Sequence, residues 1–298
     1  MISDMATRAV PSIVTDGPAT GCRALDLHLA GGLDIRILPD RGFDIGTAWF
    51  YGTQVAWISA VGETGPLDRP QDTGWIDAFG GGLVTTCGLR NVGAPSEGHG
   101  LHGTYSHLRA QNVRAEPDGD ALVARAKVVD ASAIGHHLEL EREIRTDSST
   151  RRVTVTDRTR NLGPATEAAP ILYHVNLLWD AVAIDSRQVL PRDEDAAAGL
   201  DSWTTAPPLI PGAPEQVFEH VGATRAVVTY GDLAVTLTWS RTLPRLWQWI
   251  HPGYGAFALE PANCSVLGRA HDRAQGRLPE LEPGEERTTS ITIGVEER

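Results

Sequence analysis

The chain has 298 residues, of which 41% are hydrophobic and 21% charged, a composition typical of a soluble globular protein with a sizeable core. Its net charge of −12 would repel a phosphate backbone, which argues against nucleic acid as a partner. We expect no membrane span and no secretion signal, because no run of about 18 apolar residues and no basic start before an apolar core is present. Three widely spaced cysteines argue against a zinc knuckle or a disulfide framework and fit a reducing cytoplasm.

The first part of the chain has the pattern of strands joined by short turns. Apolar and polar residues alternate on both sides of the pair Gly31-Gly32, which predicts a hairpin over residues 25–37. A turn at residues 38–42 leads into a further strand. Residues 62–78 have no regular pattern and predict a long irregular loop.

A glycine-rich stretch follows from Phe79 to His107. Its three adjacent glycines let the backbone approach a neighbouring chain or a ligand closely, and residues 83–87 then predict a short buried strand. In the next loop His99 and His102 stand between glycines, where little bulk would keep a ligand away. The stretch is therefore either a ligand-binding loop or an ordinary glycine-rich loop with surface histidines.

The middle of the chain predicts a half-buried antiparallel sheet whose charged side chains face water, over residues 113–129, 137–145 and 152–159. Pro191 opens a short helical pattern over residues 193–200, and a proline-rich loop follows. Further strands are expected at residues 226–230, 233–239, 243–264 and 290–295. Because no repeat, long helical period or linker divides the chain, we predict one all-β domain over residues 1–298, a large antiparallel β-sandwich with function in its rim loops.

His174 lies inside the apolar run of residues 169–179, and Asn176 follows two positions later. On a strand both side chains point to the same face. A histidine in such a run is most often a satisfied core residue. Two polar groups on one face of an apolar strand also fit a polar cavity, because buried polar groups need partners.

Glu260 is expected to end an apolar strand, because Pro261 follows it and cannot continue a strand ladder. Partial burial there would raise the pKa of the carboxyl group and make it a candidate general base near neutral pH. The alternative is a glutamate that caps a turn. Trp247 and Trp249, with Gln248 between them, precede this strand and are either core residues or a flat aromatic wall for the C–H faces of a sugar.

Arginine side chains are a second kind of candidate, because a guanidinium group binds carboxylates and hydroxyl groups. Arg41 occupies a turn before an apolar strand, where the alternative is a surface pair with an aspartate. An acidic or phosphorylated sugar would be favoured if several of four arginines converged on one cleft, namely Arg41, Arg90, Arg245 and Arg269.

Three motifs occur in order along this β-rich chain: HG at His102, YHVN around His174 and LEPAN around Glu260. In this combination the chain resembles the galactose mutarotase (aldose 1-epimerase) superfamily. It is most similar to a little-characterised bacterial branch, through LPDRGFDIG, FGGGLVTTCGLRNVG, GLHG, WQW, LEPANC and LPELEPGEER. The similarity extends roughly from Leu33 to Val295.

The resemblance implies a large antiparallel β-supersandwich with few short helices and a sugar cleft on a concave sheet. It also implies an isomerase that interconverts the α and β anomers of a sugar by acid/base ring opening, without a metal or other cofactor. In that family a glutamate is the base, one histidine is the acid, and a second histidine contacts the sugar oxygens. These roles fall on Glu260, His174 and His102. The candidate substrate contacts are Arg41, Arg90, Asn91, Asn176, Gln248, Trp249 and Asn263.

The sugar itself is not implied, because the characterised mutarotases carry an early Asn-Arg pair and Arg90-Asn91 stand here in reversed order. We expect a small carbohydrate as the partner and a monomer or homodimer. Two other functions remain open, a carbohydrate-binding protein without turnover and an isomerase or lyase acting on a keto-sugar. A metal site is disfavoured, because adjacent histidines on a strand point to opposite faces; its candidate ligands are His99, His102, His107, His136 and His137.

Overall fold

The structure, a computed structural model, describes residues 7–192 and 203–298. About 51% of it is strand and about 5% helix, which confirms the predicted all-β class. The short helix expected over residues 193–200 lies outside the described residues. Among the helices that are described, none is long and apolar enough to cross a membrane.

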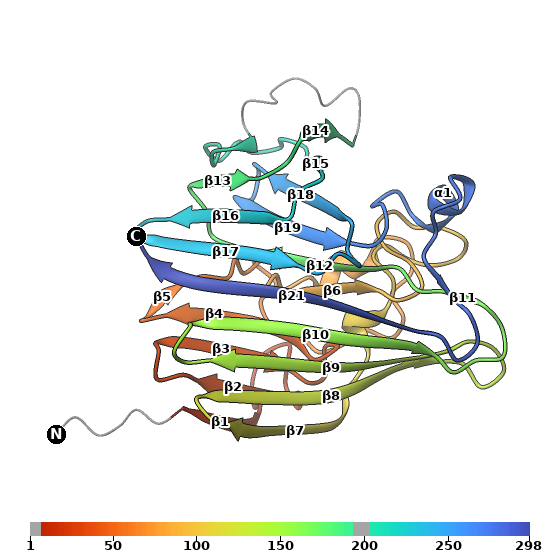
Figure 1. Cartoon of the computed structure of the whole chain (residues 1–298), viewed down its shortest axis with the longest axis horizontal. Coiled ribbons are helices and arrows are strands. Elements are labelled where there is room, and N and C mark those ends of the chain that lie inside the picture. Colours follow the sequence, from red (N-terminus) through yellow and green to blue (C-terminus); the bar gives the residue numbers. More distant parts are fainter. Residues whose placement is uncertain (1–6, 193–202) are drawn as a thin grey trace.

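Three large antiparallel sheets and one short ribbon form the described fold (Figure 1). The five-stranded sheet consists, in order, of β1 (Arg8–Ile13), β2 (Arg23–His28), β3 (Leu33–Leu38), β4 (Asp44–Phe50) and β5 (Thr53–Gln54). The eight-stranded sheet consists of β13 (Ala181–Ile184), β16 (Arg225–Tyr230), β17 (Leu233–Trp239), β21 (Glu286–Glu297), β10 (Arg152–Asn161), β9 (His137–Asp147), β8 (Ala121–Ala131) and β7 (Gln111–Asp118).

The six-stranded sheet consists, in order, of β14 (Gln188–Pro191), β15 (Gln216–Val221), β18 (Arg245–His251), β19 (Ala256–Ala262), β12 (Ile171–Asn176) and β6 (Thr85–Gly88). The ribbon pairs β11 (Glu167–Ala168) with β20 (Glu280–Leu281). The helical elements are short and comprise the 3-10 helices η1 (Gly74–Ala78) and η2 (Tyr105–His107) and the α-helix α1 (Arg269–Ala274).

The strand pattern of the sequence agrees with these elements. The predicted hairpin is present as β2 and β3, whose register pairs Leu25 with Ile37, and Gly32 has the positive φ of +85° that its turn requires. The strands expected from residue 113 onward are present as β7 to β10, β16 to β19 and β21. The loop expected over residues 62–78 is irregular except for η1, which buries Trp75.

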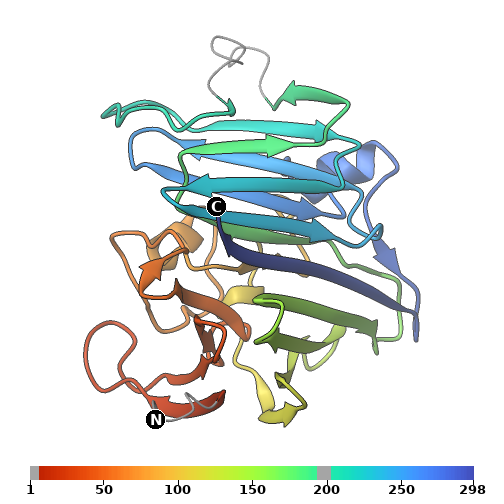
Figure 2. The same cartoon turned by 60° about the vertical axis from the view of Figure 1, so that its left-hand side comes forward.

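The main hydrophobic core lies between the sheets, and each large sheet contributes to it. Its members include Leu27 of β2, Leu140 of β9 and Leu259 of β19, which are all fully buried. Figure 2 shows the five-stranded sheet, coloured red to orange, and the yellow-green strands of the eight-stranded sheet as separate layers. The charged residues that alternate with core residues along β9 face outward, as the period-two pattern predicts.

Arg142 is an exception to the expectation that the charges of this sheet face water. It points inward from β9 and is fully buried, with Nε 2.8 Å from Asp157 Oδ1 and Nη1 2.6 Å from Asp44 Oδ1. Its Nη2 atom also donates to Thr86 Oγ1 at 2.8 Å. Arg142 therefore connects the eight-stranded sheet to β4 and to β6. A buried arginine is tolerated because two carboxylates and a hydroxyl satisfy its donors.

The strand β12 is central to the site because both of its faces are covered. All six of its residues are buried. One face packs into the main core, and the other packs against a smaller cluster that includes Trp75, Phe79, Leu172 and Trp247. This second face of the six-stranded sheet is where the candidate chemical groups lie.

Candidate functional site

His174 and Glu260 face each other across neighbouring strands. β12 and β19 are antiparallel, and their register, set by the pair Val175–Leu259, places the two residues opposite one another. Nε2 of His174 lies 3.0 Å from Oε1 of Glu260. Each residue is only 3% exposed. The predicted convergence of these two residues is present in the structure.

The strand does not end at Glu260, so that part of the prediction is wrong. β19 continues through Pro261 to Ala262, and Pro261 pairs with Leu246 of β18. Glu260 is therefore held within a strand and not in a turn. A carboxyl group on a central strand is placed more rigidly than one in a loop, because both neighbouring strands fix its backbone.

Aromatic rings surround His174. The centroid of its ring lies 5.1 Å from that of Phe79 and 5.3 Å from that of Trp249. The rings of His102 and Trp75 follow at 6.1 and 6.4 Å. Such a shell lowers the local dielectric and strengthens every interaction of the enclosed polar groups.

The glycines of the central stretch bring this aromatic shell onto the sheet. A Cβ atom on Gly80 would lie 2.2 Å from the carbonyl oxygen of Gly62, and one on Gly81 would lie 2.5 Å from that of Trp57. Gly81 also has a φ of +74°. Only glycine allows this close approach, which lets Phe79 reach the ring of His174.

Burial acts in opposite directions on the pKa values of the pair. It raises the pKa of Glu260 to about 8, with a further contribution from the negative charge of Glu215. It lowers the pKa of His174 to about 3, and the neighbouring His102 adds to this effect. At neutral pH the two side chains therefore hold one proton between them. Burial favours the uncharged form, in which Glu260 carries that proton and donates it to Nε2 of His174.

His102 is the third member of the cluster, and its tautomer is fixed. Its Nδ1 atom accepts the backbone N–H of Gly93 at 3.3 Å, so in the neutral ring the proton is on Nε2. Burial lowers the pKa of His102 to about 4, so the ring is neutral at pH 7. Its ring also packs 4.7 Å from that of Trp75. His102 can thus present an N–H donor to a ligand.

Trp249, predicted as an aromatic wall, is part of the shell, and it leads to a residue that sequence reasoning missed. Its indole N–H donates to Oε2 of Glu215 at 2.8 Å. Glu215 follows a proline-rich loop in which nothing distinguishes one exposed glutamate from another. Trp75 comes from the irregular segment of residues 62–78 and Phe79 begins the glycine-rich stretch, and no local pattern marked either residue as part of the site.

Three predicted asparagines bind the protein backbone in this structure. The Asn176 amide donates to the carbonyl of Gly82 at 2.7 Å. Asn91 donates to the carbonyl of Gly100 at 2.9 Å, and Asn263 accepts the N–H of Ile171 at 2.8 Å. Their amide groups position the loops and strands around the site.

Gln248 and Arg41 are not part of the cluster. Gln248 lies on the opposite face of β18 from Trp249, where its amide bonds to His220 at 2.8 Å and it is fully buried. Alternation along a strand dictates this separation. Arg41 is also buried and donates to the carbonyl oxygen of Ser106 at 2.6 Å. Both side chains therefore have structural partners.

The remaining arginines are paired within the protein. Arg90 bonds to His136 at 3.0 Å, and Arg245 forms an ion pair with Glu219. Arg269 forms an ion pair of 2.7 Å with Glu97, bonds to His99 at 3.0 Å and donates to the carbonyl of Arg90 at 2.9 Å. These contacts give no support for an acidic or phosphorylated sugar.

The histidines considered as metal ligands have separate partners. His99 bonds to Arg269, His136 bonds to Asp130 at 3.0 Å, and His107 accepts the N–H of Leu67. Within the described parts of the chain, no group of three or more His, Cys, Asp or Glu side chains is arranged to hold a metal ion.

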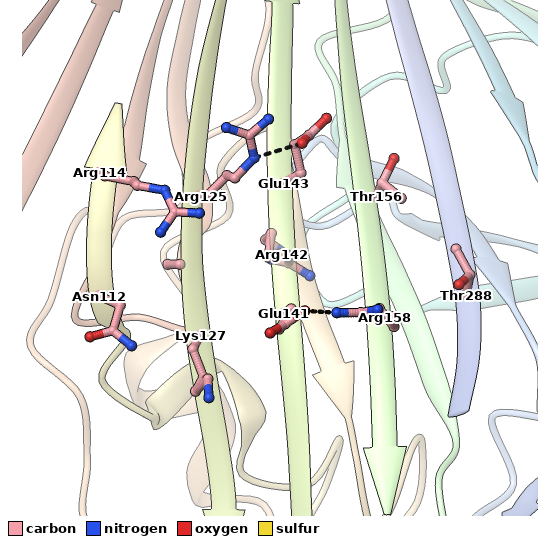
Figure 3. A pocket seen from close by; sticks show the side chains of 11 residues that line it. Asn112, Arg114, Arg125, Lys127, Glu141, Arg142, Glu143, Thr156, Arg158 and Thr288 are labelled. Carbon is pink, nitrogen blue, oxygen red and sulfur yellow. Dashed lines mark hydrogen bonds and ion pairs between the residues drawn. The ribbon is translucent and has the colours of Figure 1, made fainter. Parts of the chain in front are cut away.

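A groove of about 380 Å³ lies on the outer face of the eight-stranded sheet (Figure 3). Cross-strand ion pairs line it or flank it. Arg125 pairs with Glu143 at 2.8 Å, and Arg158 pairs with Glu141. Paired charges of this kind are usual on a solvated sheet face. None of the candidate site residues lines this groove, so we assign it no role.

Comparison with known proteins places this geometry in a family. Residues 19–295 match the model of a family described as a domain of unknown function, DUF4432. The chain belongs to the DUF4432 family. No curated protein sequence matches it significantly.

Solved structures similar to the DUF4432 chain share its fold. A protein from Klebsiella pneumoniae, described as a candidate aldose 1-epimerase, is 21% identical with a TM-score of 0.88, over 97% of this chain and 87% of that one. A galactose 1-epimerase from Lactobacillus acidophilus is 13% identical with a TM-score of 0.67, over 98% and 99% of the two chains. A galactose mutarotase-like protein from Clostridium acetobutylicum is 12% identical with a TM-score of 0.67, over 98% and 99%. The DUF4432 chain thus has the mutarotase-like β-sandwich fold, as predicted.

Proposed function

We propose that this DUF4432 protein is a cytoplasmic aldose 1-epimerase-like isomerase, a single domain over residues 1–298 that interconverts the anomers of a small sugar. The observation that carries the proposal is the buried pair of His174 and Glu260, 3.0 Å apart within an aromatic shell. Titratable groups with strongly shifted pKa values in an aromatic enclosure are typical of acid/base catalysis. The similarity to proteins described as epimerases supports the same reaction class.

Anomer exchange needs one proton acceptor and one proton donor, which the pair supplies. One member accepts the proton of the O1 hydroxyl while the other gives its proton to the ring oxygen, so that the C1–O5 bond breaks and an open-chain aldehyde forms. Rotation about C1–C2 and the reverse proton transfers close the ring on the other face. Each transfer contributes roughly 10²–10⁴-fold. The pair ends with the single proton with which it began.

The protonation state decides which residue begins as the donor. The resemblance implies Glu260 as base and His174 as acid, which requires the charged form of the pair. Burial favours the uncharged form, in which Glu260 donates and His174 accepts. Both forms carry the same number of protons and complete the same cycle. In either form the Nε2–H of His102 donates to a sugar oxygen and stabilises charge that develops during ring opening.

Anomer exchange can be measured directly by saturation-transfer NMR on a panel of aldopentoses and aldohexoses with and without the protein. We expect a sugar of this panel to show an exchange rate well above that in buffer. Binding of a sugar without faster exchange would contradict the proposal and favour a binding protein. Exchange of carbon-bound hydrogen in D2O would instead indicate an isomerase or lyase that acts on a keto-sugar.

A further inference from the structure

The rim beside Trp249 carries an ionised carboxylate. Glu215 has a side chain that is 41% exposed, and its Oε1 atom lies 2.9 Å from Nη1 of Arg192. Its Oε2 atom accepts the indole N–H of Trp249 at 2.8 Å. Partial burial opposes ionisation, but these hydrogen bonds outweigh it and lower the pKa of Glu215. A fixed carboxylate at the edge of a site is a strong acceptor for hydroxyl groups.

A series of ring contacts leads from the buried pair to the surface. The ring of His174 lies 5.3 Å from that of Trp249, and Trp249 lies 6.1 Å from His251. His251 in turn lies 4.7 Å from Tyr254. Tyr254 is 73% exposed, so a large aromatic side chain meets solvent at the outer end of the series. Tyrosine combines an apolar face with a hydroxyl group, which suits contact with a ligand that is both apolar and polar.

Two aliphatic side chains extend this surface. Leu209 is 69% exposed and Ile210 47% exposed. The N–H of Ile210 donates to the carbonyl of Pro252 at 3.1 Å. A Cβ atom on Gly255 would lie 3.2 Å from Cδ2 of Leu209, so the loop packs directly on the turn between β18 and β19. The apolar surface beside Tyr254 is therefore already formed before a ligand arrives.

From these contacts we infer that Glu215, His251, Tyr254 and Leu209 form a second sugar subsite, here called the rim subsite, and that the substrate class is the reducing disaccharides. The inference rests on the proposed function, because it places the reducing ring at the buried pair. The second ring packs its C–H face on Tyr254 and Leu209, and its hydroxyl groups donate to Glu215. A disaccharide linked through a carbon other than C1 of its reducing ring keeps O1 and the ring oxygen free for anomer exchange.

The test compares glucose with maltose, cellobiose and lactose, which all have glucose as the reducing ring. Dissociation constants and anomer-exchange rates are measured by NMR for the wild type and for Tyr254→Ala, Tyr254→Phe and Tyr230→Ala. Tyr230 is a matched control, since it is a partly exposed tyrosine on β16, in a different sheet. We expect at least one disaccharide to bind the wild type about three- to tenfold more tightly than glucose. Tyr254→Ala should abolish this preference, whereas Tyr254→Phe and the control should retain it.

Failure of the rim subsite can be distinguished from failure of the proposed function. Glucose exchange with equal affinity for glucose and every disaccharide would overturn the rim subsite and leave the epimerase proposal intact. If Tyr254→Ala lowered the affinity for glucose as much as the affinity for the disaccharides, the rim subsite would also be overturned and the epimerase proposal would stand. A disaccharide preference that depends on Tyr254, without any anomer exchange, would support the subsite and contradict the epimerase. If none of these sugars binds and none shows faster anomer exchange, the rim subsite is overturned.

Discussion

Nε2 of His174 lies 3.0 Å from Oε1 of Glu260, and this contact joins two buried strands in which most residues are apolar. Two titratable groups buried in contact give weak net stability, because removing both from water costs about as much as their mutual interaction returns. The pair also breaks the apolar pattern of both strands without an evident gain in packing. Local departures of this kind are expected at functional sites.

The first prediction concerns the two members of the pair. Glu260→Gln keeps the size of the side chain but removes its proton exchange, and His174→Asn removes the ring nitrogen that faces it. Each change should lower the anomer-exchange rate by at least about 100-fold. The double variant should lose little more than either single variant, because both residues act in one proton relay.

Saturation-transfer NMR of whichever sugar binds gives these rates, and the dissociation constant serves as the control. Glu260→Gln should still bind the sugar, since its amide retains hydrogen-bonding capacity. An unchanged exchange rate in Glu260→Gln would show that the carboxyl group has a structural role.

The second prediction concerns stability and pH. Burial raises the pKa of Glu260 from 4.5 to about 8 in the folded state. The stabilising contribution of a raised pKa is fully present below 4.5 and is lost as the pH rises through 8. The wild type should therefore lose free energy of unfolding relative to Glu260→Gln over this range, by up to about 1.4 kcal/mol per pH unit.

Chemical denaturation of both proteins between pH 6.5 and 8 isolates this effect. The pKa of His174 is lowered from 6.5 to about 3, so its stabilising contribution is lost only as the pH falls below 6.5. A constant difference between the wild type and Glu260→Gln across this window would mean that the carboxyl group is already ionised.

Much of the fold was predictable because period-two alternation depends only on neighbouring residues. The same alternation also dictates that Gln248 and Trp249 face opposite sides of β18. Because Trp249 faces His174, Gln248 faces away from it. The end of β19 was misplaced because Pro261 interrupts the hydrogen bonding of one residue but not the strand.

The shell and the rim were not predictable from local sequence. Phe79 reaches His174 only because glycines allow the backbone to pass against residues far away in the chain. Glu215 gains its position from a hydrogen bond to Trp249, 34 residues later. Asn91 and Asn263 each bond to the protein backbone, and the local sequence does not distinguish an amide that contacts a ligand from one that holds a loop.

The third prediction concerns the buried arginine that joins the sheets. Arg142→Met would leave Asp44 and Asp157 buried without their cation, which should cost about 3–5 kcal/mol of unfolding free energy. Arg158→Met is the matched control on the next strand of the same sheet, since Arg158 is 52% exposed and pairs with Glu141 at the surface. That change should cost less than about 1 kcal/mol. Urea denaturation gives the unfolding free energy of each variant. Equal losses in the two variants would show that the buried ion pairs of Arg142 contribute no more to stability than the surface pair of Arg158.

The fourth prediction concerns His102, whose φ of 56° is unusual for a residue with a side chain. His102→Asn tolerates this backbone conformation, because asparagine adopts it more readily than most residues. The change removes the Nε2–H donor and should lower kcat/KM for anomer exchange by about 10²–10³-fold, with little change in the melting temperature. His102→Ala should lower both. If His102→Asn retained full activity, the donor role would have to be abandoned.

The last prediction concerns the charge at the rim. The carboxylate of Glu215 contributes to the raised pKa of Glu260, after burial itself. Glu215→Gln removes this charge while its amide oxygen still accepts the indole N–H of Trp249. The pKa of Glu260 should then fall. Because the pair needs its single proton for catalysis, the alkaline limb of the pH–rate profile, expected near pH 8, should move to lower pH.

Glu219→Gln is the matched control for this change, since Glu219 lies four residues later on β15 and pairs with Arg245. Its alkaline limb should stay where that of the wild type is. The rate of anomer exchange is measured from pH 5 to 10 for the three proteins. If the alkaline limb of Glu215→Gln moved to higher pH, the carboxylate of Glu215 would lower the pKa of Glu260, which contradicts the prediction. An unshifted limb with a lower rate throughout would mean that Glu215 acts by holding Trp249 in place and not through its charge.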